Sequence, residues 1–147
     1  MSDVKLPEQT ADMYCHAIYS TWHIVNRAYK SQLAPLGLTY PQYITLTLLW
    51  DKDGRTVGEI AVSLAMESNT LTPLLKRLEA DGYLLRKRSA EDERQVRISL
   101  TPKGKSLRSK AREITACMIE ATGLTEDQLN SLVGSLKTIG QNLSPDR

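Results

Sequence analysis

A cysteine and a tyrosine one helical turn apart are the residues whose types and spacing suggest chemistry most directly. Cys15 and Tyr19 are four residues apart in a segment with helical periodicity, so their side chains should lie on one face. A phenol that donates a hydrogen bond to a thiolate stabilises the charged, nucleophilic form of the sulfur. Such a thiolate attacks a peroxide oxygen and becomes a sulfenic acid, the reversible first stage of thiol oxidation. The alternative is a small buried cysteine beside a structural tyrosine, and no lysine or arginine lies near Cys15 to favour the reactive thiol.

Positive charge is concentrated in the middle of the chain. The 147 residues hold 19 Lys and Arg against 17 Asp and Glu, a net charge of +2. Residues 76–112 contain twelve of the basic and five of the acidic side chains, a net of +7, so the rest of the chain has a net charge of −5. A basic segment between acidic flanks favours a face that binds a polyanion. A solvated face on a helix and hairpin is the alternative.

Length and composition suit one globular domain. Hydrophobic residues make up 41% of the chain and charged residues 24%, which is ordinary for a folded protein. The first ten residues lack the apolar core of a signal peptide, and no run of about 18 apolar residues could span a membrane. Two cysteines cannot form a disulfide framework. We therefore expect a cytoplasmic protein.

Apolar periodicity and capping residues predict the element order α-α-α-α-β-β-α-α. A long first helix is expected over 8–34, with Pro7 in its first turn and Pro35 at its end. Thr56, followed by Glu59, forms a capping-box pattern for the third helix. Because a proline is tolerated in the first turn, Pro73 places the start of the fourth helix near residue 69 or 70. The other helices are expected over 41–50, 102–121 and 125–143, and the strands over 83–88 and 95–100.

Two helices joined by a short turn and followed by a hairpin make a winged helix-turn-helix. The predicted fold class is therefore mainly α with a small β-hairpin wing, with N- and C-terminal dimerisation helices. In this fold the second helix of the motif enters a major groove of DNA and the hairpin reaches the backbone or the minor groove. A generic helical bundle with a hairpin is the alternative, but it does not explain why the basic segment coincides with the motif.

The terminal helices favour a dimer. Their apolar stripes exceed what a DNA-binding part of about 60 residues can cover, so a second copy is the simplest partner. A two-fold dimer presents two recognition helices to the half-sites of a pseudo-palindromic operator. The predicted organisation is one domain over 1–147, with dimerisation helices over 8–34 and 102–147 and a DNA-binding part over 41–101.

Several motifs resemble a known family. The runs LTPLLKRLEADG (71–82) and EDERQVRISLTPKG (91–104) resemble the MarR family of dimeric winged-helix repressors. More narrowly, YCHAIY (14–19), Tyr29 and GLTYPQY (37–43) resemble its organic-hydroperoxide-sensing (OhrR) branch. The resemblance implies a reduced dimer that represses transcription, and a cysteine whose oxidation by an organic hydroperoxide releases the DNA.

The resemblance also implies a sensor pocket around Cys15 that includes Tyr19, Tyr29 and Tyr40. Tyr29 is fourteen residues from Cys15, or about 21 Å along one helix, so it cannot touch Cys15 of its own chain. If all four residues share a pocket, Tyr29 and Tyr40 come from the other subunit. Plain core packing is the alternative for Tyr29.

Cys117 is the second thiol. Two-cysteine members of the branch carry a resolving cysteine in this region, so the resemblance implies a disulfide between Cys117 and the oxidised Cys15 of the partner. The alternatives are a core cysteine and, in place of a protein disulfide, a small-molecule thiol that pairs with Cys15.

The predicted DNA-binding residues lie on the recognition helix and the wing. Ser68, Asn69, Thr70 and Thr72 are expected to read bases and phosphates, and Lys76, Arg77, Arg86 and Arg88 to contact phosphates. The resemblance implies that Asp92 orients Arg94, which enters the minor groove and reads its width. Lys103, Lys105 and Lys110 are expected to be merely solvated.

No cofactor, metal site or enzymatic arrangement is predicted. His16 and His23 could share a helix face, but no further ligand accompanies them. A glycine-rich phosphate loop and a Ser/His/Asp arrangement are both missing from the sequence. The leading hypothesis is a redox-switched repressor. The alternatives are a MarR-type repressor released by a small aromatic ligand, with Cys15 incidental, and a thiol peroxidase, which would not need the basic winged motif.

Overall fold

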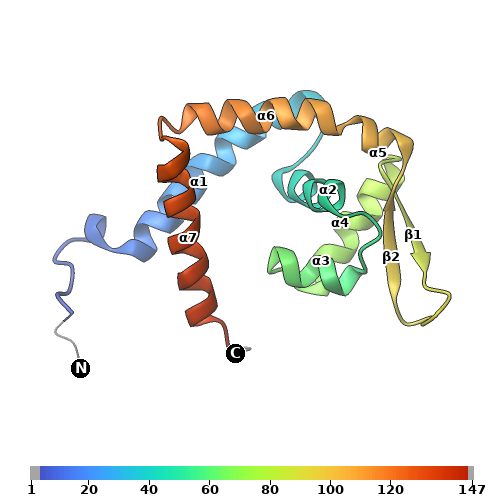
Figure 1. The fold of residues 1–147 in the computed structure, drawn as a ribbon, viewed down its shortest axis with the longest axis horizontal. Coiled ribbons are helices and arrows are strands. Elements are labelled where there is room, and N and C mark those ends of the chain that lie inside the picture. The colour runs from blue at the N-terminus through green and yellow to red at the C-terminus, as the bar shows by residue number, and fades with distance from the viewer. Residues whose placement is uncertain (1–3, 146–147) are drawn as a thin grey trace. The chain divides into compact units, whose positions relative to one another are not determined.

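The computed structural model describes residues 4–145, which form two compact units, one ending at Ala111 and the other beginning at Arg112. The fold is mostly helical, with one two-stranded antiparallel hairpin, as the sequence predicted. Figure 1 shows α2, α3 and α4 grouped beside the β1–β2 hairpin. This grouping is the winged helix-turn-helix.

Helix α1 (Tyr14–Leu33) begins later than predicted. A single 3-10 turn (Thr10–Asp12) precedes it, and Met13 is extended with a φ of −82° and a ψ of 124°. The prediction that the helix starts at residue 8 with Pro7 in its first turn was wrong. The extended backbone of Met13 interrupts the helical pattern between the 3-10 turn and Tyr14, so the segment that contains Pro7 cannot continue the helix. The other end matches the prediction, because a 3-10 turn (Ala34–Leu36) and Gly37, at a φ of 66°, end the helix.

Side-chain caps define the next two helices, α2 (Tyr40–Asp51) and α3 (Val57–Leu64). The Thr56 hydroxyl accepts a bond from the Glu59 amide, and the Glu59 carboxylate accepts one from the Thr56 amide. This capping box confirms the predicted start of α3. Thr39 and Gln42 make the same reciprocal pair at the start of α2.

The recognition helix α4 (Ser68–Ala80) begins one or two residues earlier than predicted. Pro73 therefore lies in its second turn, and the prediction that it stays within the first turn was wrong. The proline removes a single backbone donor, the one that would reach the carbonyl of Asn69. Burial of the helix's leucine face compensates for this loss, since Leu71, Leu75 and Leu78 are almost wholly inaccessible.

The wing pairs β1 (Leu84–Arg88) with β2 (Val96–Leu100), in a register that places Leu84 opposite Leu100. A short segment before α3 attaches to the outer side of β2. The Ile98 amide donates to the Arg55 carbonyl at 2.8 Å, and Arg97 Nη1 donates to the Gly54 carbonyl at 2.8 Å. The hairpin is thereby fixed to the helix-turn-helix rather than projecting from it freely.

The predicted helix over 102–121 is interrupted. It divides into α5 (Pro102–Ser106) and α6 (Arg108–Ala121), with Leu107 between them. The Ser106 hydroxyl donates to the Lys103 carbonyl at 2.8 Å and competes with the helical pattern at this point. Helix α7 (Glu126–Leu143) starts with a capping box between Thr125 and Gln128, one residue after the predicted start at 125.

The hydrophobic core lies within the first unit. Nine large apolar side chains are at most 1% exposed, and they come from α1, α2, α3, α4 and both strands: Leu33, Leu46, Leu49, Ile60, Leu71, Leu75, Leu78, Leu84 and Ile98. Among residues 112–145 no residue is buried. The apolar side chains of α7 are therefore all at least partly exposed.

One tight junction holds α5 against the end of α4 and should be sensitive to a single methyl group. A Cβ at Gly104 would collide with the Tyr83 carbonyl oxygen, and the Gly104 carbonyl accepts the Trp50 indole proton at 2.9 Å. We expect Gly104→Ala to lower the free energy of unfolding by about 1–3 kcal/mol in urea denaturation. The control is Gly58→Ala in α3, where a Cβ meets nothing closer than 3.9 Å. Equal stability of the two variants would contradict this account.

Candidate DNA interface and thiol sensor

The N-terminal turn of α4 presents hydroxyl and amide side chains to solvent. Ser68, Asn69 and Thr70 are exposed because the leucine face of the helix is turned into the core. Thr72 is half-buried and donates its hydroxyl proton to the Ser68 carbonyl at 2.8 Å. These are groups that can donate to and accept from base edges and phosphates. Further along the helix, the predicted phosphate contacts Lys76 and Arg77 are also exposed.

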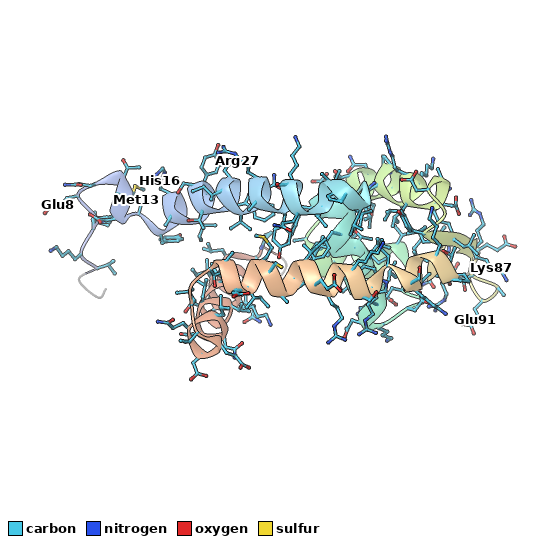
Figure 2. The ribbon with its side chains drawn as sticks, turned by 90° about the horizontal axis from the view of Figure 1, so that it is seen from above. Glu8, Met13, His16, Arg27, Lys87 and Glu91 are labelled. Carbon is cyan, nitrogen blue, oxygen red and sulfur yellow. The ribbon has the colours of Figure 1, made fainter. Side chains whose placement is uncertain are left out.

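The wing loop holds an arginine outward. Asp92 Oδ1 lies 3.2 Å from Arg94 Nε and also accepts the Arg94 amide at 3.0 Å. The Arg94 side chain is 92% exposed, so this pairing orients the guanidinium without covering it. Arg88 donates through Nη1 to the Glu93 carbonyl at 2.9 Å and braces the same loop. Figure 2 shows Lys87 and Glu91 at the end of the hairpin, pointing away from the helices.

A hollow of about 410 Å³ separates the recognition helix from the wing. Its lining includes Ser68 and Thr72 from α4, Arg86 from β1, and Arg94 and Gln95 from the wing loop. The structure thus brings together these five polar side chains from α4, β1 and the wing loop, and four of them were predicted to contact DNA. Two guanidinium groups beside two hydroxyls suit the phosphate oxygens of a nucleic acid backbone.

Glu79 fixes the wing to the recognition helix. One carboxylate oxygen accepts the Arg86 amide at 2.8 Å, and the other accepts Arg86 Nε at 3.2 Å. These bonds, the backbone one foremost, hold the pKa of Glu79 below its ordinary value of 4.5. Arg86 therefore links α4 to β1 as well as facing the hollow. Glu79 was not predicted from the sequence, because no local pattern connects a helix residue to the strand that follows.

Lys103 is bonded rather than merely solvated. Its ammonium group donates to the Asp81 carbonyl at 2.7 Å, just beyond the last turn of α4, and lies 4.7 Å from the centre of the Tyr83 ring. A cation at the C-terminal end of a helix stabilises the exposed carbonyl groups there. The prediction of a purely solvated Lys103 was wrong.

Four aromatic rings form a cluster between α1 and α2. The Tyr29 ring lies 5.0 Å from that of Tyr40 and 5.3 Å from that of Tyr43, and the Trp22 ring meets Tyr40 edge-on at 4.8 Å. Tyr43 is 4% exposed, while Tyr29 and Tyr40 are half-buried. Tyr29 and Tyr40, both predicted for the sensor pocket, therefore lie together within one protomer. Burial, reinforced by Tyr43, raises the pKa of both tyrosines.

Cys15 lies in the first turn of α1, exposed and without neighbouring charge. Residues 13–26 contain no Asp, Glu, Lys or Arg. Tyr19 is 65% exposed, and its ring packs edge-on against His23 at 4.4 Å, on the side away from Cys15. Within residues 4–145 no hydrogen bond joins Cys15 to Tyr19. Figure 2 shows Met13 and His16 at this end of α1 and Arg27 further along the helix.

Cys117 belongs to the part of α6 that falls in the second unit. It is exposed and is a free thiol, as is Cys15. Its neighbours along the helix include Met118, which is half-buried, and Ile119, which is 50% exposed. Because its side chain is exposed, Cys117 is not a core cysteine of the protomer.

A groove of about 710 Å³ separates α1 from the recognition helix. Asn26 and Lys30 of α1 line one side, Tyr40 of α2 lies beside them, and Pro73 and Arg77 of α4 line the other side. Two cations and an aromatic ring could accommodate a small aromatic anion there.

Comparison with known proteins identifies the family. The profile of the transcriptional regulators SarA/Rot matches residues 27–111. The chain is 40% identical over 129 residues to the organic hydroperoxide resistance transcriptional regulator of Bacillus subtilis, covering 88% of each protein. The chain belongs to the SarA/MarR family of winged-helix transcriptional regulators. It is also 43% identical over 137 residues to the regulator TtmR of Methylorubrum extorquens, covering 93% of this chain and 70% of that protein.

A solved structure of another regulator supports the same fold and partner. Reduced AbfR bound to DNA, a protein of Staphylococcus epidermidis, has a TM-score of 0.77 and 32% identity, covering 91% of this chain and 93% of that one. The predicted family resemblance is therefore confirmed. This SarA/MarR-type protein is a DNA-binding transcriptional regulator, and the relatives' regulatory role argues against an enzyme.

No helix within residues 4–145 is long and apolar enough to cross a membrane. The same residues contain no group of three or more His, Cys, Asp or Glu side chains arranged to hold a metal ion.

The Glu79 clamp should make stability depend on pH in a defined direction. Because the folded-state pKa lies below 4.5, the carboxylate stabilises the fold above pH 4.5, and this contribution is lost as the pH falls through the lower folded-state value. We expect Glu79→Gln to lower the free energy of unfolding by about 1 kcal/mol at pH 7, with a deficit that shrinks below pH 4.5. Urea denaturation at several pH values measures this. Glu91→Gln in the exposed wing loop is the control, and a deficit independent of pH would argue against the clamp.

Proposed function

We propose that this protein is a homodimeric repressor whose operator binding is switched off when an organic hydroperoxide oxidises Cys15. The observation that carries the proposal is an exposed thiol in a DNA-binding chain, on the first part of α1, where residues 13–26 carry no Asp, Glu, Lys or Arg. The 40% identity to a regulator named for organic hydroperoxide resistance supports it. The protein would act as a cytoplasmic switch without catalytic turnover and without a bound cofactor.

Exposed apolar side chains support the dimer. On α1, Tyr14 is 59% exposed, and Ile18 and Trp22 are each 42% exposed. On α7, Leu132 and Leu136 are 47% and 41% exposed. Large apolar residues in such number on one monomer are typical of an interface. A two-fold dimer buries them and presents both recognition helices to half-sites about 34 Å apart.

In the proposed complex with DNA, the recognition helix α4 and the wing on either side of the hollow both contact the DNA. Ser68, Asn69, Thr70 and Thr72 approach base edges and nearby phosphates in the major groove. Lys76, Arg77, Arg86 and Arg88 neutralise phosphates, and Arg94, held by Asp92, enters the minor groove. The hollow between helix and wing is the space in which the intervening backbone would lie.

The sensing step is nucleophilic displacement on the peroxide. The Cys15 thiolate attacks the terminal oxygen of the hydroperoxide, a sulfur–oxygen bond forms, and the oxygen–oxygen bond breaks. The alkoxide leaves and takes a proton to become an alcohol, so the sulfur is oxidised to sulfenic acid and the peroxide is reduced. Absence of charge over 13–26 favours a substrate whose substituent is apolar.

Cys117 is proposed as the resolving thiol. Its sulfur attacks the Cys15 sulfenic acid of the partner subunit, a disulfide forms, and water leaves. AbfR has been solved both reduced on DNA and with a disulfide, and the disulfide form has a lower TM-score to this chain, 0.64 against 0.77. We infer that disulfide formation changes the spacing of the two recognition helices so that they no longer fit both half-sites.

A second candidate is release by a small aromatic ligand, with Cys15 incidental. The groove between α1 and α4 favours it, since Lys30, Tyr40 and Arg77 line a space of about 710 Å³. A ligand there would contact the recognition helix directly. A DNA-binding assay with either an organic hydroperoxide or an aromatic carboxylate added therefore distinguishes the two candidate functions.

The sensor assignment predicts the behaviour of Cys15→Ser. Fluorescence anisotropy with the protein's own upstream DNA should show tight binding by the reduced wild type, loss after a small excess of cumene hydroperoxide, and recovery with dithiothreitol. Cys15→Ser should bind DNA equally well and ignore the peroxide, because serine cannot form a sulfenic acid. Cys117→Ser is the companion variant and should still be oxidised at Cys15 without forming the intersubunit disulfide. If peroxide still releases Cys15→Ser from the DNA, Cys15 is not the sensor. If only aromatic carboxylates release the protein from the DNA, the groove between α1 and α4 is favoured as the ligand site.

The wing assignment predicts a loss of DNA affinity in Arg94→Ala. Removing a minor-groove guanidinium should weaken binding by roughly ten-fold, at 1–3 kcal/mol per specific contact. Lys110→Ala, at an exposed position on α6, is the matched control and should bind nearly as the wild type does. Equal DNA affinities of the two variants would show that Arg94 does not contribute to the DNA interface.

A further inference from the structure

Arg86 and Arg94 are held by carboxylates in the same way. The Glu79 carboxylate accepts the Arg86 amide at 2.8 Å and Arg86 Nε at 3.2 Å. Asp92 Oδ1 accepts the Arg94 amide at 3.0 Å and Arg94 Nε at 3.2 Å. Each carboxylate therefore fixes both the backbone and the inner guanidinium nitrogen of its arginine. Within residues 4–145 the terminal nitrogens Nη1 and Nη2 of both arginines make no hydrogen bond.

These free terminal nitrogens belong to the hollow between α4 and the wing. Neighbouring arginines use theirs within the protein, since Arg88 and Arg97 each donate through Nη1 to a backbone carbonyl, at 2.9 and 2.8 Å. Among the described residues, the lining of the hollow includes both carboxylate-held arginines and neither of the two carboxylates. The hollow therefore presents guanidinium groups without the acidic groups that position them.

We propose that Glu79 is a positioning residue for DNA binding, which orients Arg86 so that both terminal nitrogens of its guanidinium donate to one backbone phosphate. A guanidinium can make two parallel bonds to a phosphate, which a lysine ammonium group cannot. The Arg86 and Glu79 side chains are only 29% and 33% exposed, so the arginine is ordered before DNA arrives and loses less side-chain entropy on binding. The inference rests on the proposed phosphate contact of Arg86 and adds a residue that lies behind the contact surface.

Glu79→Gln tests the inference, because net charge and positioning predict effects of opposite sign. Removal of a negative charge near DNA should strengthen binding if only the net charge matters. Loss of positioning should weaken binding, because the glutamine amide can accept only one of the two bonds from Arg86. We expect the reduced variant to bind the protein's own upstream DNA about three- to ten-fold more weakly in fluorescence anisotropy, the factor for one net hydrogen bond. Glu91→Gln removes the same charge from the exposed wing loop and is the matched control, which should bind at least as tightly as the wild type.

Salt dependence separates positioning from a general loss of structure. Arg86→Ala removes a phosphate contact, so the slope of log affinity against log salt concentration should fall by about one. Glu79→Gln keeps the Arg86 charge, so its slope should stay near the wild-type value while its affinity falls. Arg86→Lys should also bind more weakly than the wild type with an unchanged slope, because the ammonium group keeps the charge without the two parallel bonds. In an Arg86→Ala background, Glu79→Gln should have no further effect on DNA binding.

The outcomes distinguish this inference from the proposed function. If Arg86→Ala binds DNA as tightly as the wild type, the proposed phosphate contact of Arg86 fails. If Arg86→Ala binds more weakly while Glu79→Gln does not, only the positioning role of Glu79 fails. A loss from Glu79→Gln that persists in the Arg86→Ala background would also overturn the inference, since it would reflect the fold rather than the arginine. Circular dichroism shows whether each variant is folded, and wild-type affinity of Arg86→Lys would overturn the inference even if Glu79→Gln did not fold.

Discussion

Burial of the leucine face of α4 is the constraint on which the DNA-binding part depends. Leu71, Leu75 and Leu78 are at most 1% exposed, and the helix packs against α2, α3 and β1. Once this face is turned inward, the opposite face and the N-terminal turn must lie in solvent, with the hydroxyl and amide groups of Ser68 to Thr70. Glu79, at the other end of the helix, then fixes the wing through Arg86. One hydrophobic contact surface thus determines both the recognition surface and the position of the hairpin.

Much of the fold could be predicted because its signals are local. The capping boxes at Thr56 and Thr125 each involve residues three positions apart, and the leucine stripe of α4 repeats within a single helix. The errors arose where local rules compete with packing. The first helix is interrupted at the extended Met13, which the apolar periodicity does not signal. Pro73 is accepted in the second turn of α4 because leucines on both sides of it are buried.

The candidate site was less predictable than the fold, because several of its contacts depend on tertiary packing rather than on local sequence patterns. Asp92 and Arg94 are two residues apart in one loop, so their pairing could be expected. Glu79 and Arg86 meet only because a strand turns back along its helix, and Tyr29 and Tyr43 only because α1 packs on α2. The GLTYPQY run placed Tyr43 three residues after Tyr40, on the same side of α2, and this spacing was the available signal. Which tyrosine rings come into contact depends on tertiary packing that spacing alone does not specify.

The uneven distribution of buried residues has a consequence for how much active regulator a cell contains. Every buried side chain among residues 4–145 belongs to the first unit, and the 18-residue α7 buries none of its own. A helix of that length is only marginally stable in water without a packing partner. In the proposed homodimer its folding would therefore be coupled to assembly, and the folded fraction would rise with the concentration of the protein. Newly made chains at low abundance would carry a formed DNA-binding part and an unformed C-terminal helix, so expression level itself becomes a determinant of operator occupancy.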